Sequence, residues 1–304
     1  MGKVLAEAFP DARAVFQEVD EALSQNLSRL MWQGPEDELT LTENAQPAIM
    51  AASVAIIRVL QKESHLDLAR HARLVAGHSL GEYTALAASD AFTLSDAALL
   101  LKTRGRAMQE AVPVGRGAMS ALLGAEIDVA EAVAKEAVES APETEEKPVC
   151  VVANDNSPGQ VVISGTSAAV ARAGEIAKGK GVKRAIPLSV SAPFHCVLMQ
   201  PAAEKMREAL SRVTIRSPRA PIVANVTAAE INEPETIRRL LVEQVTARVR
   251  WRESVLRFKP LGVDTTIEVG GNKVLTGMVK RIDRDLRTLT LDTPADIEAF
   301  AKTL

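Results

Sequence analysis

Apolar positions recur along this chain with two different periods, and these periods predict its helices and strands. Residues 11 to 30 carry apolar side chains at the helical period, which predicts one amphipathic helix. Residues 48 to 60 are apolar nearly all round, with Pro47 in the first turn, as expected for a helix packed deep against a sheet. A third helix is expected from Ser95, as its N-cap, to Val112.

The middle of the chain alternates short strands with helices. The sequence predicts strands at 117–124, 149–153, 160–164 and 184–190, helices at 127–140 and 166–179, and a turn at 154–159. This βαββαβ order fits a ferredoxin-like unit. We therefore expect a small domain, residues 117–189, inserted into a larger domain formed by residues 1–116 and 190–304.

The last third of the chain returns to alternating strands and helices. Strands are expected at 221–226 and 265–269, and helices at 198–210, at 235–245 and from Trp251 onward. Such alternation is typical of a mainly parallel sheet covered on both faces. The chain is therefore predicted to be an α/β protein.

Composition narrows the classes of function. Hydrophobic residues make up 47% and charged residues 25% of the chain, as in ordinary globular proteins. The net charge of −3 argues against a nucleic-acid binder, and the apolar run at 48–60 is too short to span a membrane. Cys150 and Cys196 lack metal-ligand spacing, so we expect a cytoplasmic protein without metal or cofactor.

The first chemical signal is the motif Gly-His-Ser-Leu-Gly at residues 77–81. A short apolar run, Leu74-Val75-Ala76, precedes it and a small-residue helix follows, which is the context of a nucleophile elbow. In that interpretation the sharp turn from strand to helix leaves no room for a Cβ on either side of the serine, so glycine is required at both positions. Ser79 lies at the positive end of the helix dipole. The alternative is an ordinary Gly-Ser turn before a helix.

A serine nucleophile needs a base, and the chain has only four histidines. His65 and His71 lie in a polar segment that indicates the surface, and the turn directs the side chain of His78 away from the serine. His195 comes long after the serine and before a helix, as expected of the base in this class. Elimination therefore favours His195, and the alternative is a histidine that caps a helix.

The remaining parts of such a site are less marked in the sequence. No acidic residue stands out to orient the base, but a backbone carbonyl can accept from its Nδ1–H instead. The N–H of Leu80 is the expected oxyanion donor. Arg104 has the fork that binds a carboxylate, although from the pattern alone a surface arginine is favoured.

Several stretches together resemble the malonyl-CoA:acyl carrier protein transacylases of bacterial fatty acid synthesis. They are Glu43–Ala48, Gly77–Tyr83, Arg104-Gly105, Met108–Pro113, Asn156–Gln160, Val190–His195, Asn225-Val226, Glu268–Gly270 and Lys273–Gly277. The ordered matches span nearly the whole chain. The resemblance implies an α/β-hydrolase-like large domain with a ferredoxin-like small domain.

The resemblance also implies a reaction. Ser79 would take a malonyl group from malonyl-CoA as an ester and pass it to the phosphopantetheine thiol of holo acyl carrier protein. His195 would be the base, oriented by the main-chain carbonyl of Gln244, and Arg104 would pair with the malonyl carboxylate. Phe194 resembles the residue of malonyl-preferring members. Further positions that match the family near its site are Gln46, Asn156, Gln160 and Arg184.

One part of the family pattern is expected ahead of the matched region. Members begin with a strand and a Gly-Gln-Gly-Ser-Gln loop that gives a second oxyanion donor, whereas this sequence starts beyond that loop. Two alternatives to the transferase remain open: a serine hydrolase, and a carrier-binding protein without catalysis, of which only the second is motivated by that loop. A monomer is expected.

Overall fold

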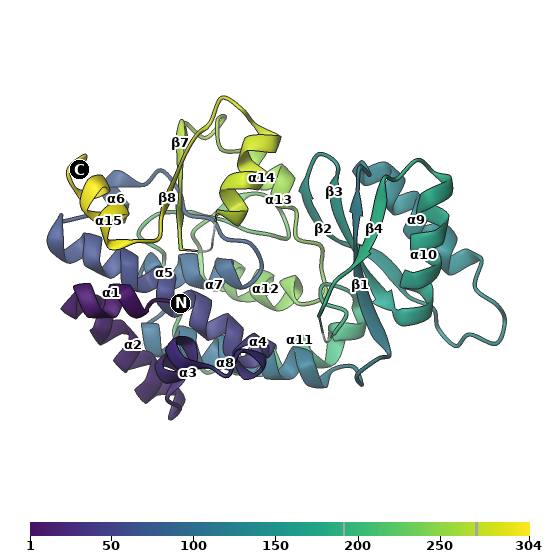
Figure 1. The fold of residues 1–304 in the computed structure, drawn as a ribbon, viewed down its shortest axis with the longest axis horizontal. Coiled ribbons are helices and arrows are strands. Elements are labelled where there is room, and N and C mark those ends of the chain that lie inside the picture. The colour runs from purple at the N-terminus through teal and green to yellow at the C-terminus, as the bar shows by residue number, and fades with distance from the viewer. Residues whose placement is uncertain (191, 271–272) are drawn as a thin grey trace.

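The computed structural model describes residues 1–190, 192–270 and 273–304. Figure 1 shows a larger part that contains both ends of the chain and a smaller part, with its own sheet, beside it. The α/β architecture predicted from the sequence is confirmed. Among the described residues, no helix is long and apolar enough to cross a membrane.

Helices come first along the chain. They are α1 (Lys3–Ala8), α2 (Pro10–Leu23), α3 (Leu27–Gln33), α4 (Glu36–Thr40), α5 (Thr42–Glu63) and α6 (Leu68–His71). The single helix expected over 11–30 is wrong, because Ser24 takes a left-handed φ of 48° and Asn26 caps a new helix by accepting from Arg29 N. Helix α5 begins earlier than expected, so Pro47 lies in its second turn.

The core of the larger part forms where α5 packs against α2, α7 (Leu80–Ala88) and α8 (Leu94–Glu110). The expected N-cap of α8 is wrong by two residues, because Thr93 Oγ1, not Ser95, accepts from Asp96 N at 3.0 Å. On α8, Leu99 is 47% exposed, while Leu101 and Met108 are buried. The helix is therefore turned so that its apolar stripe faces α5.

The smaller part holds one antiparallel sheet. Its strands are β1 (Gly117–Leu123), β2 (Cys150–Ser157), β3 (Gln160–Thr166) and β4 (Arg184–Pro187), in the order β2-β3-β1-β4, with helices α9 (Ile127–Glu139) and α10 (Ser167–Gly179). The predicted βαββαβ order is observed, and these helices share their own core with the sheet. The exact domain boundaries stay a prediction. Residues 154–157 were expected in a turn but continue β2.

Strands in the larger part are short. They are β5 (Ile222–Val223), β6 (Glu230–Ile231), β7 (Thr265–Val269) and β8 (Arg287–Leu291). Helix α11 (Gln200–Ser211) comes before these strands and follows a 3-10 turn at Val197–Met199. The other helices are α12 (Pro234–Gln244), α13 (Trp251–Leu256), α14 (Val274–Ile282) and α15 (Pro294–Ala301). Strands β7 and β8 pair in parallel, and β5 pairs with β6 antiparallel. The strand expected at 74–76 is a single parallel bridge from Val75 to Ile222.

Candidate active site

Ser79 occupies a strained turn at the start of α7. Its φ of 51° and ψ of −109° lie in a region that non-glycine residues rarely adopt, and such strain is concentrated at functional sites. A Cβ at Gly77 would lie 2.0 Å from Gly81 O, so only glycine fits there. A Cβ at Gly81 would meet nothing within 4 Å, so the expected lack of room is wrong at that position.

Two buried residues that the sequence analysis missed hold this turn from behind. The Asn225 side chain accepts from Ser79 N at 2.7 Å and donates to Gly77 O at 2.7 Å. Glu82 Oε2 in turn accepts from Asn225 N at 3.2 Å. Both residues fall in stretches that carry the family resemblance, and that was the only signal for them.

His195 lies against the serine. Its Nε2 is 2.9 Å from Ser79 Oγ, and its Nδ1 is 2.9 Å from Gln244 O. With Nδ1–H donating to the carbonyl, Nε2 is left to accept the hydroxyl proton of Ser79. Burial, together with the charge of Arg104, lowers the pKa of His195 to about 3. The imidazole is therefore neutral, the form that a general base requires.

Gln244 joins the parts of the site through its side chain as well as its carbonyl. Its Nε2 donates to Ser79 O at 3.0 Å and to Glu82 Oε2 at 2.7 Å. Its Oε1 accepts from Arg104 Nη2 at 2.9 Å. The residue is fully buried, so these contacts fix the serine, the base and the arginine relative to one another.

Arg104 is a buried cation beside Ser79, not the surface arginine favoured by pattern alone. It is 1% exposed, and its Nη2 lies 3.0 Å from Ser79 Oγ while Nη1 donates to Gln46 Oε1 at 2.7 Å. The guanidinium also lies over the ring of Tyr83 at 5.6 Å. Burial raises the pKa of Glu82 to about 7, although its hydrogen bonds and Arg104 favour the ionised form.

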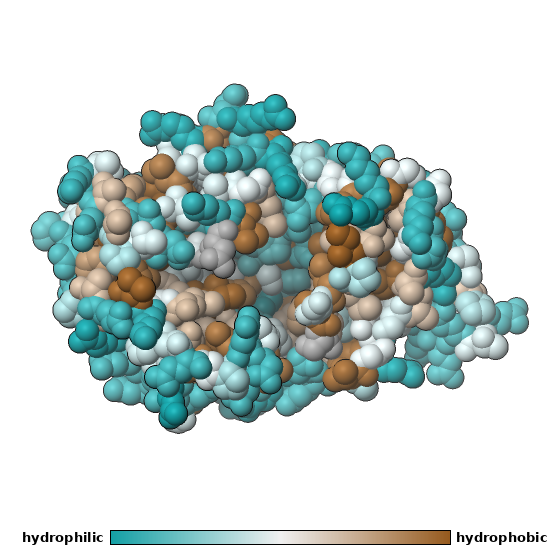
Figure 2. All heavy atoms as spheres, in the orientation of Figure 1, coloured by the Kyte–Doolittle hydropathy of each residue, from teal (hydrophilic) through white to brown (hydrophobic). Residues whose placement is uncertain are grey.

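The other predicted site residues fall into two groups. Asn156 Oδ1 lies 2.8 Å from His78 Nε2, and Phe194 packs between the two parts of the molecule. Gln160 instead accepts from Arg281, and Arg184 is exposed at the start of β4. Figure 2 shows a hollow between the two parts, with hydrophobic residues along the wall formed by the smaller part.

Leu80 is the first residue of α7, where backbone N–H groups have no partner within the helix. Its N–H follows the serine directly, and the positive end of the helix dipole lies there. This position suits a donor to a developing oxyanion.

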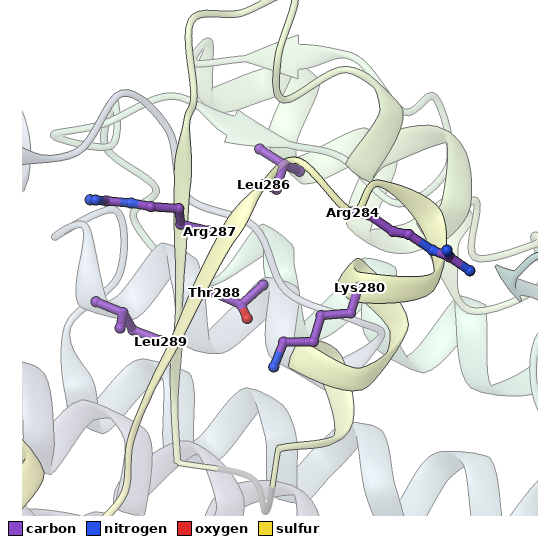
Figure 3. A pocket seen from close by; sticks show the side chains of 6 residues that line it. All are labelled: Lys280, Arg284, Leu286, Arg287, Thr288 and Leu289. Carbon is purple, nitrogen blue, oxygen red and sulfur yellow. The ribbon is translucent and has the colours of Figure 1, made fainter.

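A separate pocket lies on the outer side of β8 and α14. It has a volume of about 710 Å³, and it is lined by Lys280, Arg284, Leu286, Arg287, Thr288 and Leu289. Figure 3 shows Arg287 and Leu289 pointing away from the side where Lys280 and Arg284 lie. The basic groups therefore do not converge on one point. The Gly-Gly-Asn-Lys stretch at residues 270–273 lacks the spacing of a phosphate loop and is expected to be a tight strand-to-helix turn, but Gly271 and Asn272 lie outside the described residues.

The three arginines at positions 248, 250 and 252 form a basic cluster whose members are all paired. Arg248 and Arg252 form ion pairs with Glu131 and Glu126 of the smaller part, and Arg250 pairs with Glu253. Arg248 and Arg252 therefore tie the two parts together, while the ion pair of Arg250 lies within the larger part.

Comparison with known proteins agrees with this geometry. Residues 1–290 match the acyl transferase domain family. The chain is 44% identical over its whole length to the malonyl CoA-acyl carrier protein transacylase of Bacillus subtilis, covering 92% of that protein. It is 42% identical to the Escherichia coli enzyme of the same name over 97% of this chain and 92% of that protein.

Solved structures give the same result. The acyl-carrier-protein-S-malonyltransferase of Bartonella henselae superposes with a TM-score of 0.95 and 50% identity, over 100% of this chain and 94% of that one. A malonyl-transacylase solved in complex with a type II PKS acyl-carrier protein superposes with a TM-score of 0.93 and 40% identity, over 100% of this chain and 95% of that one. Fold and site thus define an acyl transferase with an α/β-hydrolase-like large domain and a ferredoxin-like small one. The chain belongs to the malonyl CoA-acyl carrier protein transacylases, as the sequence resemblance predicted.

Proposed function

We propose that this enzyme transfers a malonyl group from malonyl-CoA to the phosphopantetheine thiol of holo acyl carrier protein, through a malonyl ester on Ser79. The observation that carries the proposal is the buried Arg104 guanidinium 3.0 Å from Ser79 Oγ. A desolvated cation beside the nucleophile favours an acyl group that carries a free carboxylate. The names of the relatives support the same substrates.

In the first half-reaction Ser79 Oγ attacks the thioester carbonyl and its proton passes to His195 Nε2. Leu80 N–H stabilises the oxyanion of the tetrahedral intermediate. The intermediate collapses as the C–S bond breaks, and the CoA thiolate takes the proton from His195. Gln244 O stabilises the imidazolium that exists between these two proton transfers.

In the second half-reaction the carrier thiol replaces CoA. His195 removes the thiol proton, the thiolate attacks the ester carbonyl, and Ser79 Oγ leaves and regains the proton. Arg104 holds the malonyl carboxylate throughout, so the acyl group is presented to both thiols in one orientation. Release of malonylated carrier protein restores the free enzyme.

Intact-mass measurement tests this sequence. Incubation with malonyl-CoA should add one malonyl group to the wild-type protein and none to Ser79→Ala, and holo acyl carrier protein should then remove it. Steady release of CoA without the carrier would instead indicate a serine hydrolase. Absence of both a mass gain and CoA release would overturn both enzyme mechanisms and leave a carrier-binding protein.

A further inference from the structure

Helix α5 approaches α8 very closely beside Arg104. A Cβ at Gly105 would lie 2.5 Å from Glu43 Cα and 2.6 Å from Thr42 O, so only glycine fits where the two helices meet. Glu43 also forms an ion pair with Lys102 of α8 at 3.1 Å. The first turns of α5 are therefore held against the stretch of α8 that carries Arg104.

Gln46 lies one turn after Thr42 on α5, and its amide is held at both ends. The side chain is 4% exposed, and its Nε2 donates to Thr42 Oγ1 at 3.0 Å and lies 4.0 Å from Met108 Sδ. Its Oε1 accepts from Arg104 Nη1 at 2.7 Å. A guanidinium has donors only, so the amide must present its oxygen to Arg104. The direction of the Gln46 side chain is therefore fixed by its neighbours.

The hydrogen-bond partners of Arg104 among the described residues are uncharged. They are the amide oxygens of Gln46 and Gln244 and the hydroxyl of Ser79. The buried carboxylate of Glu82 is separated from the guanidinium by an amide, since Gln244 donates to Glu82 through Nε2 and accepts from Arg104 through Oε1. Neutral acceptors orient a cation without cancelling its charge, whereas a carboxylate in contact would form a buried ion pair. The charge of Arg104 therefore remains available to an anionic group in the site.

Arg104 also keeps hydrogen-bonding capacity. Its guanidinium has five N–H donors, and its bonds to the two amides and the serine use three of them. Its Nε is buried and has no hydrogen-bond partner within the described chain. A buried cation in this state gains most from a ligand that carries its own negative charge.

We propose that Gln46 is a positioning residue that determines selectivity for malonyl: its uncharged amide holds the Arg104 guanidinium toward the acyl group without neutralising it. The inference rests on the proposed function, in which Arg104 pairs with the malonyl carboxylate. The family match placed Gln46 among the substrate-binding residues, whereas in this proposal it acts on the substrate through Arg104. Selectivity here means the ratio of kcat/KM for malonyl-CoA to that for acetyl-CoA.

Two substitutions separate the charge at position 46 from its hydrogen bond. Gln46→Glu keeps the length and the acceptor but places a negative charge against Arg104, so kcat/KM for malonyl-CoA should fall at least about tenfold. Gln46→Met keeps the length and loses the acceptor, and should cause a fall of about fivefold or more. The loss should lie mainly in KM, because Arg104 holds the carboxylate in the ground state and the transition state alike. Transfer from acetyl-CoA should change less than about twofold in both variants.

Glu43→Gln is the matched control at the same helix contact. It removes the partly exposed ion pairs with Lys102 and Arg106 and leaves the bond between Gln46 and Arg104 in place. It should lower Tm slightly and leave selectivity as in wild type. If Gln46→Glu does not fold, Gln46→Met gives the same comparison with the control.

Equal losses with malonyl-CoA and acetyl-CoA in the Gln46 variants would overturn the proposal in favour of a purely structural role. The same loss of selectivity in Glu43→Gln would also overturn it, since loosening of the helix contact would then be the cause. Arg104→Lys separates these results from failure of the proposed function. If Arg104→Lys loses selectivity and the Gln46 variants do not, the role of Gln46 alone is wrong; if Arg104→Lys keeps wild-type selectivity, the role of Arg104 is wrong as well.

Discussion

Arg104 Nη2 lies 3.0 Å from Ser79 Oγ, so the proposed nucleophile shares a hydrogen bond with a buried cation. The same Nη2 donates to Gln244 Oε1, and the backbone carbonyl of Gln244 orients His195. Arg104 and His195 are therefore joined through one glutamine, which in the proposed mechanism couples selection of the acyl group to activation of the serine. A change at Arg104 should alter which acyl group is chosen more than whether the serine can react.

Arg104→Lys should lower kcat/KM for malonyl-CoA by about 10- to 150-fold, because a lysine keeps the charge but loses the two parallel bonds, and a charge-assisted bond contributes roughly 1.5–3 kcal/mol. Steady-state kinetics with malonyl-CoA and with acetyl-CoA measure the effect. Transfer from acetyl-CoA, which has no free carboxylate, should change little. Equal losses with both substrates would show that Arg104 acts on the serine and not on selection.

Burial of His195 should make the fold sensitive to acid. Its pKa is lowered to about 3, whereas an unfolded histidine titrates near 6.5, so the unfolded chain binds the extra proton as the pH falls below about 6.5. This one group should cost about 2 kcal/mol of the free energy of unfolding at pH 5. Urea titrations between pH 7 and pH 5 measure it.

The control for that acid effect is a histidine outside the site. His195→Gln should make the loss of stability between pH 7 and pH 5 shallower, while His65→Gln, at an exposed position, should leave it as in wild type. If His195→Gln instead loses stability as steeply as wild type and His65→Gln loses less, the acid sensitivity arises outside the site.

Much of the fold was predictable from the sequence because local periodicity and packing agree. The prediction of secondary structure was wrong where tertiary contacts determine whether a segment forms a strand. Residues 154–157 are polar and read as a turn, but Asp155 N donates to Val249 O and the Asn156 side chain contacts His78, so contacts with the larger part extend the strand. The Leu74–Ala76 segment reads as a strand, yet only Val75 forms a bridge, since strand pairing depends on partners elsewhere in the chain.

The site divides in the same way. The Ser79 turn was predictable from five adjacent residues, and His195 from elimination among four histidines. The pairing of His195 with a backbone carbonyl has no side-chain signature, so only the family resemblance pointed to Gln244. The position of Arg104 depends on how α8 is rotated against α5, which periodicity alone did not determine.

Glu82→Gln should remove a pH dependence of malonyl selection. The pKa of Glu82 is raised to about 7, so its carboxylate ionises as the pH rises through that value, and its negative charge then weakens the attraction of Arg104 for the malonyl carboxylate. Among the neighbouring groups, burial lowers the pKa of both His195 and His78 and raises that of Tyr83. We expect kcat/KM for malonyl-CoA to fall between pH 6 and pH 8 in wild type and to stay level in the variant.

Acetyl-CoA is the matched substrate for the Glu82 experiment, because it has no carboxylate for Arg104 to attract. Its kcat/KM should show no fall over the same pH range in either protein. A variant that retains the wild-type fall with malonyl-CoA would place the titrating group elsewhere.

Gly77→Ala and Gly81→Ala should differ sharply although the two glycines flank the same serine. The Cβ at Gly77 would lie 2.0 Å from a backbone oxygen, so the turn must open, and we expect a loss of at least about 3 kcal/mol in the free energy of unfolding. At Gly81, in the first turn of α7, the Cβ has space, and alanine should be neutral or stabilising by up to about 1 kcal/mol. Chemical denaturation of both variants measures the contrast. Comparable losses would mean that the space beside Gly81 is filled in solution.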